Sequence, residues 1–281
     1  MFFGLVYLRK LLLLYFDDRT ITITILLIGL GTNLYFYTSI AVGMPHVYLF
    51  CLFSVAIYYT ISWLEVLDIK KTVLLGFVFG LMILVRPVMI VTLFLPLFQV
   101  FKLNNKWAYF KTNLGLIILF GFSILLVWVP QFLYWKEATG SFLHYSYSGE
   151  MFYFFEPKVF SSLFSFRKGW LLYTPMMLFS LIGLIFMFHN KHKLALSIAI
   201  CTGVYLYLAS CWWCWWFGGS FGLRPMIDMY PLLAISLTFF VRYILQSYKA
   251  LKVSIVSLLV FACLLNLFQS RQRHEGLLHH D

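Results

Sequence analysis

Apolar runs dominate the chain, and several reach about 20 residues, the length that a helix needs to cross a bilayer. Hydrophobic residues fill 62% of the 281 positions and charged residues 11%. A soluble domain is about 45–50% apolar and about 25% charged. Backbone groups inside lipid must be hydrogen-bonded within the chain, which favours helices. The sequence therefore predicts an all-α polytopic membrane protein.

Most of the 21 lysines and arginines lie in short clusters between the apolar runs. Such clusters are typical of cytoplasmic loops and of contacts with anionic lipids. Although the net charge is +11, this distribution favours membrane lipids as partners over nucleic acid. The first 16 residues carry Arg9 and Lys10 in their middle and have no small-residue cleavage site, so we predict no cleavable signal peptide.

One domain over residues 1–268 is expected to hold about eight spanning helices and a short helical hairpin. The run from Thr72 to Phe101 is too long for one span, since 30 residues of helix measure about 45 Å. Arg86 and Pro87 interrupt it, because proline removes a helix donor and restricts its predecessor. We expect the hairpin to turn there, which also returns the following basic cluster to the side of the others. The spans are expected over 1–16, 21–42, 47–64, 112–134, 170–188, 194–210, 230–243 and 253–268.

Two longer connections are expected on the outer surface, at residues 135–169 and 211–229. The first is rich in aromatic and charged residues and predicts an amphipathic segment lying on the membrane. The second begins with four tryptophans within Trp212–Trp216. Tryptophan collects where lipid meets water, so an aromatic belt is favoured over a sugar-stacking platform. Residues 269–281 are predicted to form a polar outer tail.

Arg224 and Asp228 are the charged residues of the second outer segment. Arg224 could neutralise a phosphate leaving group, while Asp228 could orient Arg224 or bind a sugar hydroxyl. The alternative is an ion pair between them that locks the loop. Cys211 and Cys214 have a spacing seen in metal and redox sites, but no second Cys or His pair is near, so no metal site is predicted.

Arg86 lies within an apolar run, where a charge is costly unless it faces protein, water or a ligand. It is either a phosphate contact or a hairpin-tip residue that reaches the interface. Arg167 and Lys168 precede the span at 170–188. They could bind a lipid phosphate, since guanidinium contacts phosphate oxygens two at a time and ammonium adds a point charge. Alternatively they anchor this helix to headgroups. Tyr173 would lie in its first turn.

His46 and two glutamates complete the candidates. His46 stands in the short outer turn that begins at Gly43, and we favour a structural histidine over a donor to sugar or phosphate. Glu150 and Glu156 are candidate acid or base carboxylates in the first long outer segment. Their alternative is the solvated face of an amphipathic helix.

Taken together, the chain resembles bacterial membrane glycosyltransferases of the GT-C type. This group is related to the protein mannosyltransferases of family 39 and to the aminoarabinose transferase that modifies lipid A. The resemblance runs from about residue 5 to the tail, and its last two motifs are the more specific. The motifs follow in the family's order as GTNLYFYTSIAVGMPHVYLF, GLMILVRPVMI, LFSFRKGWLLYTP and WWFGGSFGLRPMIDMYPLLA.

The resemblance implies a GT-C-like fold and an inverting transferase of the bacterial inner membrane. Its donor would be a sugar on a polyprenyl phosphate, and its acceptor a lipid, glycan or protein outside the cytoplasm. No further cofactor is implied, and metal dependence stays open. The matched motifs would place Arg167, Lys168 and Arg224 at the carrier phosphate. The remaining matched residues would line the same cavity: His46, Arg86, Tyr173 and Asp228.

One family feature is missing, because such enzymes carry an acidic base in the first large outer loop. Here the first outer turn, Gly43 to His46, has no carboxylate. We therefore expect the chain to be a piece that lacks the N-terminal catalytic portion, unless Glu150 or Glu156 substitutes as base. Two other functions stay open: a transporter or flippase of a lipid-linked anion, and a non-catalytic membrane scaffold subunit.

Overall fold

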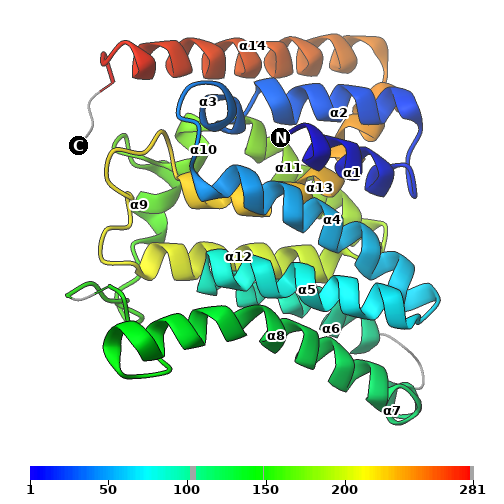
Figure 1. Cartoon of the computed structure of the whole chain (residues 1–281). Helices are drawn as coiled ribbons and strands as arrows, with labels where there is room; N and C mark the ends of the chain where they lie inside the picture. The colour runs from blue at the N-terminus through cyan, green and yellow to red at the C-terminus, as the bar shows by residue number, and fades with distance from the viewer. Residues whose placement is uncertain (102–105, 148, 279–281) are drawn as a thin grey trace.

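The computed structural model describes residues 1–101, 106–147 and 149–278, and it is helical almost throughout (Figure 1). Within these ranges the extended structure is limited to one isolated bridge. The helices, with η marking 3-10 geometry, are α1 (Phe2–Leu12), α2 (Asp18–Leu30), α3 (Leu34–Ser39), α4 (Pro45–Glu65), α5 (Ile69–Val85), η1 (Pro87–Leu93), α6 (Phe94–Phe101), α7 (Lys106–Thr112), α8 (Leu114–Thr139), α9 (Val159–Phe164), α10 (Trp170–Tyr173), α11 (Met176–His189), α12 (Ala195–Cys211), η2 (Arg224–Met229), α13 (Tyr230–Gln246) and α14 (Lys249–His274).

In the described part of the chain, four helices are long and apolar enough to cross a membrane: α4, α8, α14, and η2 with α13 taken together. The segment formed by η2 and α13 is the most deeply buried of these four, and it packs against α2, α4, α11 and α12. By contrast, α8 and α14 lie at the periphery and expose long apolar faces. Three further apolar helices are shorter, at Pro87–Phe101, Met176–His189 and Ala195–Cys211. The structure is thus that of an all-helical protein with four candidate spans.

Two expected spans are broken near one end of the bundle. The run 21–42 divides into α2 and α3 at Asn33. The side-chain amide of Asn33 donates to the Phe221 carbonyl and accepts a hydrogen bond from the Tyr230 hydroxyl. The run 170–188 divides at Pro175, and α10 ends before it. The expectation of two continuous helices was wrong, since the chain satisfies tertiary hydrogen bonds at these breaks instead of extending each helix.

The expected reversal at Arg86 and Pro87 is present. Arg86 is extended (φ −146°, ψ 111°) and follows the last residue of α5, while Pro87 begins η1. The segment η1 packs back against α5, and α6 returns toward the end where α5 started (Figure 1). Of the lysines that follow, Lys102 lies outside the described residues.

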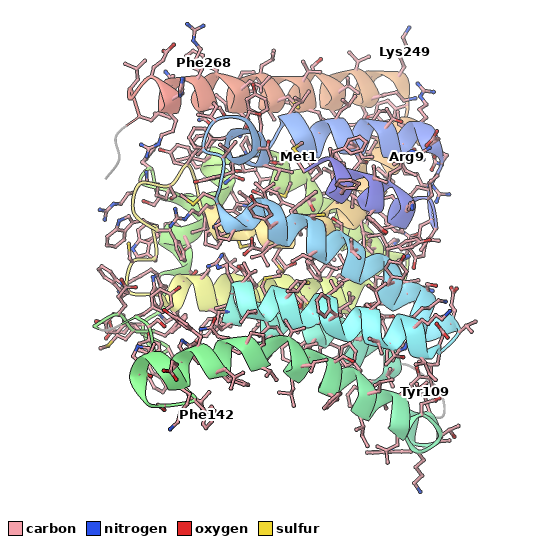
Figure 2. The ribbon with its side chains drawn as sticks, viewed as in Figure 1. Met1, Arg9, Tyr109, Phe142, Lys249 and Phe268 are labelled. Atoms are coloured by element: carbon pink, nitrogen blue, oxygen red, sulfur yellow. The ribbon has the colours of Figure 1, made fainter. Side chains whose placement is uncertain are left out.

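The bundle has two distinct ends. Arg9, Tyr109 and Lys249 lie toward this end in Figure 2, whereas Phe142 and Phe268 lie toward the opposite end. The connections formed by 140–147, 149–158 and 212–223 also lie at the end of Phe142 and Phe268 (Figure 1). We call it the loop end; it carries every candidate site residue described below.

Small residues allow close packing between the apolar helices. A Cβ at Gly76 would lie 2.5 Å from Ser123 Cβ, and one at Gly80 would lie 3.0 Å from Val127, so α5 and α8 approach closely. A Cβ at Gly183 would lie only 1.9 Å from the Ser236 carbonyl oxygen on α13. Helices in membranes associate through such small-residue contacts, because lipid offers no hydrophobic driving force between them.

Candidate functional site

Asp228 lies on η2, completely buried, at the centre of a polar cluster. Its Oδ2 accepts hydrogen bonds from Arg86 Nη1 (2.8 Å) and from the Tyr205 hydroxyl (2.5 Å). Its Oδ1 lies 2.8 Å from Nδ1 of the buried His46. A buried carboxylate is costly unless it is paired and hydrogen-bonded, and here both oxygens are satisfied. We call these four residues the Asp228 cluster; it joins α4, the turn between α5 and η1, α12 and η2.

The partner of Asp228 corrects two sequence-based alternatives. Asp228 pairs with Arg86 across 142 positions of sequence, not with Arg224 four residues away. Arg86 is therefore an inward-facing residue with 21% of its side chain exposed, and not a hairpin-tip residue reaching for the interface. Tyr205 was missed, because one hydroxyl within the apolar run of α12 has no distinctive spacing.

Arg224 begins η2 and is half-buried. Its Nη1 lies 3.8 Å from the Met44 sulfur, a weak acceptor. Among the described residues, no ion pair includes Arg224. It nevertheless lies within electrostatic range of the second guanidinium, Arg86. Asp228 pairs with Arg86 only, so the charge of Arg224 leaves this corner of the loop end with an excess of positive charge.

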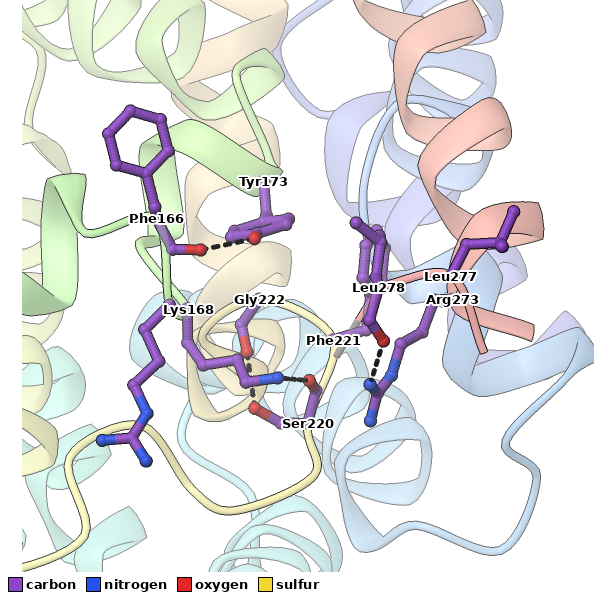
Figure 3. A pocket seen from close by; sticks show the side chains of 10 residues that line it. Phe166, Lys168, Tyr173, Ser220, Phe221, Gly222, Arg273, Leu277 and Leu278 are labelled. Atoms are coloured by element: carbon purple, nitrogen blue, oxygen red, sulfur yellow. Dashed lines mark hydrogen bonds between the residues drawn. The ribbon is translucent and has the colours of Figure 1, made fainter. Parts of the chain in front are cut away.

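A second group of cations surrounds a cavity of about 240 Å³ at the loop end, which we call the basic cavity. Arg167, Lys168 and Arg273 line it together with Tyr173, whereas Arg224 is not among its lining residues. Lys168 Nζ donates to the Ser220 carbonyl (2.8 Å), and Arg273 donates to the Leu278 carbonyl (2.8 Å) and to that of Gly219. Figure 3 shows Lys168 and Arg273 on opposite sides of Phe221.

Two expectations bear on this cavity. The resemblance placed all the cations in one cavity with His46 and Asp228, whereas the structure forms two groups. In addition, α14 continues to His274 and Arg273 reaches back to Gly219, so the expected polar tail does not separate from the bundle at residue 269. The last part of that tail, residues 279–281, lies outside the described residues.

The loop of residues 218–222 is held between the two groups. The Tyr37 hydroxyl accepts a hydrogen bond from the Phe221 amide (2.7 Å), and the Tyr37 ring packs edge-on against His46. Gly222 has φ +61°, and a Cβ there would lie 3.0 Å from Tyr173 Cβ. A residue with a side chain would be strained at this φ and crowded against Tyr173. The loop is therefore a fixed element of the site.

A third feature, the aromatic cavity, measures about 230 Å³ and is formed where the two outer segments meet. Tyr153 donates its amide to the Cys211 carbonyl (2.6 Å), and Trp213 donates to Met151 (3.0 Å). Glu156 also lines it, with a carboxylate oxygen 3.9 Å from Lys158 Nζ. The rest of the lining is Ser210, Trp212, Trp215 and Trp216.

The two candidate carboxylates differ in position. Glu156 lines the aromatic cavity, whereas Glu150 lines neither cavity and accepts the Tyr145 hydroxyl at its carbonyl (2.7 Å). The expected amphipathic helix around them does not form, since residues 140–147 and 149–158 are not helical. Instead, backbone hydrogen bonds between residues 151–158 and residues 210–213 hold this connection in place. Cys211 and Cys214 are free thiols.

Comparison with protein-family models, with curated proteins and with solved structures gives no match. The resemblance to membrane glycosyltransferases therefore rests on the sequence motifs.

Proposed function

We propose that this chain is the membrane domain of a glycosyltransferase that uses a sugar linked to a polyprenyl phosphate. The observation that carries the proposal is the pair formed by Arg86 of the Asp228 cluster and Arg224 near it. Arg86 and Arg224 come from distant segments and lie within electrostatic range of each other, and of the two only Arg86 is paired with the buried carboxylate of Asp228. Two cations at such a position repel each other, and an anionic ligand offsets this cost.

The hydrogen bonds of Arg86 support a phosphate as this ligand. Its bonds among the described residues all use Nη1, so that Asp228 and Tyr205 fix the guanidinium from one side. The Nε–Nη2 edge has no hydrogen bond to the described protein groups. That edge presents two parallel donors, the geometry that binds two oxygens of one phosphate. Arg224 would add the second cation.

In the reaction, an acceptor hydroxyl attacks the anomeric carbon of the donor sugar as the bond to the phosphate oxygen breaks. The leaving polyprenyl phosphate gains charge, which prearranged cations stabilise. A base takes the proton of the hydroxyl. Asp228 is unsuited to this role because its oxygens already accept three bonds from Arg86, His46 and Tyr205. Glu156 is the better candidate, since its exposed carboxylate lines a cavity.

The test is transfer of radiolabelled sugar from a panel of polyprenyl-phosphate donors, in membranes that contain the chain. We expect Arg224→Ala to lower the turnover number by about 10²–10³, the loss typical of one charge-stabilising donor. Arg242→Ala is the matched control, because Arg242 is exposed near the other end of α13. Unchanged turnover in Arg224→Ala, or no transfer from any donor by the chain, would contradict the proposal.

The Asp228 cluster also supports a second candidate, a transporter of a lipid-linked anion. Ionisable residues buried between membrane helices often mark a substrate or proton path, and Asp228 and His46 are such residues. A transporter would move a fluorescent polyprenyl phosphate across proteoliposomes without breaking its sugar bond. A transferase releases the carrier and the glycosylated acceptor as separate products, so chromatography of the lipids distinguishes the two.

A further inference from the structure

The aromatic cavity is lined by side chains that binding of a phosphate does not require. Its walls contain the faces and edges of four indoles and one phenol, together with one carboxylate and one ammonium group. Trp213, one of these indoles, is 43% exposed. Pockets that combine several aromatic walls with a few polar groups are typical ligand sites.

The tryptophans form a rigid platform and not a loose surface patch. Trp212 packs edge-on against Phe152 (4.7 Å between ring centroids), where the isolated bridge joins the two outer segments. Trp213 and Trp215 each contact Trp216 edge-on, at 6.4 and 5.9 Å. The guanidinium of Arg167 stacks 3.8 Å from the Trp216 ring. The rings are therefore held before any ligand arrives, which lowers the entropic cost of binding.

We infer that the aromatic cavity binds a neutral saccharide. The faces of a sugar ring present C–H groups that pack on the electron-rich faces of indoles. Its hydroxyl groups need both acceptors and donors, and Glu156 and Lys158 supply one of each at the rim. Glu156 and Lys158 also cancel in charge, so the cavity has no preference for an anionic sugar. The volume of the cavity, about 230 Å³, admits a small ligand such as a single sugar ring.

The position of the cavity gives this site a role in the proposed reaction. Trp212 of the aromatic cavity packs edge-on against Tyr147 (5.6 Å between ring centroids), and Tyr147 lies within electrostatic range of Arg86, so Tyr147 connects the cavity wall to the proposed phosphate site. A saccharide on the platform would place its hydroxyls beside Glu156. This role, as the acceptor site of the transferase, rests on the proposed function. Saccharide binding itself does not, because it requires neither a carrier lipid nor turnover.

The test is saturation-transfer NMR on the whole chain in nanodiscs with four soluble probes: chitotetraose, cellotetraose, maltotetraose and mannotetraose. We expect saturable binding of at least one probe. Trp213→Ala should weaken it about tenfold or more, the loss typical of a tryptophan at the centre of a binding site. Trp213→Phe should restore part of the affinity, and Glu156→Gln should weaken it less than Trp213→Ala. Trp107→Phe is the matched control, because Trp107 is an exposed tryptophan on α7, at the end of the bundle opposite to the loop end (Figure 1).

Two results would overturn the inference. The first is the absence of saturable binding for all four probes; quenching of Trp213 by brominated lipid would then mark the platform as a membrane anchor. The second is equal affinity in wild type and Trp213→Ala. Size-exclusion profiles of each variant show whether it is folded. Failure of sugar transfer with retained saccharide binding would contradict the proposed enzyme and leave this site standing.

Discussion

Removal of the Asp228 carboxylate is the perturbation for which the structure gives the clearest magnitude. Asp228 is completely buried and holds Arg86, His46 and Tyr205 from three other segments. Breaking a buried ion pair by removing one partner costs about 3–5 kcal/mol, because the other charge is left without compensation. Arg86 keeps 21% of its side chain exposed and can regain some hydration. We therefore expect Asp228→Ala to lower the free energy of unfolding by about 3–4 kcal/mol, the lower part of that range.

The paired variant tests the reasoning more sharply than the single one. Arg86→Met with Asp228→Leu removes both charges and keeps apolar volume, so it should cost less than Asp228→Ala alone. The assay is unfolding by SDS titration in mixed micelles, read by far-UV circular dichroism. Arg9→Ala is the control, since the Arg9–Asp18 pair is exposed and should contribute less than about 1 kcal/mol. If the paired variant costs the sum of the two single substitutions, the two charges are not coupled and the argument fails.

Two further predictions concern helix packing and helix capping. Gly183→Ala should destabilise the protein by about 1–3 kcal/mol, because the added methyl group overpacks against Ser236. Gly203→Ala should not, because a methyl group there meets open space. Thermal unfolding of the two variants compares them directly. Asp17 accepts the Thr20 hydroxyl and amide at the start of α2, and these bonds hold the pKa of its carboxyl below the ordinary value. Asp17→Ala should therefore cost about 1 kcal/mol near neutral pH. Because the folded-state pKa is the lower one, this contribution is present above the ordinary pKa of about 3.9 and disappears as the pH falls through the folded value. Equal differences between wild type and Asp17→Ala at pH 7 and pH 2.5 would contradict it.

Local rules were sufficient to predict the reversal at Arg86 and Pro87, because a proline in an overlong apolar run leaves few alternatives. The same rules failed for the run 21–42. Its break at Asn33 depends on Phe221 and Tyr230, which lie nearly 190 positions or more away. No pattern within the run itself shows those partners. The eight spans and the GT-C architecture stay predictions, since length and composition support four candidate spans.

The candidate site, like the fold, could be predicted from the sequence only in part. Residue type and position were enough to select Arg86, Asp228, Arg167 and Lys168, because charges next to apolar runs need a partner or a ligand. Pairing was not predictable, since Arg224 and Asp228 are near in sequence but Asp228 binds Arg86. The tryptophans of 212–216 could be identified as an aromatic belt or a sugar-stacking platform, but the cavity that they form with Glu156 could not be predicted. It arises where 151–158 meets 210–216, through backbone bonds that no side-chain pattern encodes.

The central claim is that Arg86 and Arg224 bind the phosphate of a polyprenyl carrier. The most direct measurement is the ³¹P NMR signal of polyprenyl phosphate titrated into nanodiscs that contain the chain. A saturable shift in wild type and in Arg242→Ala, lost in Arg224→Ala and in Arg86→Met/Asp228→Leu with the fold intact, is the result predicted here. An unchanged affinity in Arg224→Ala would contradict it.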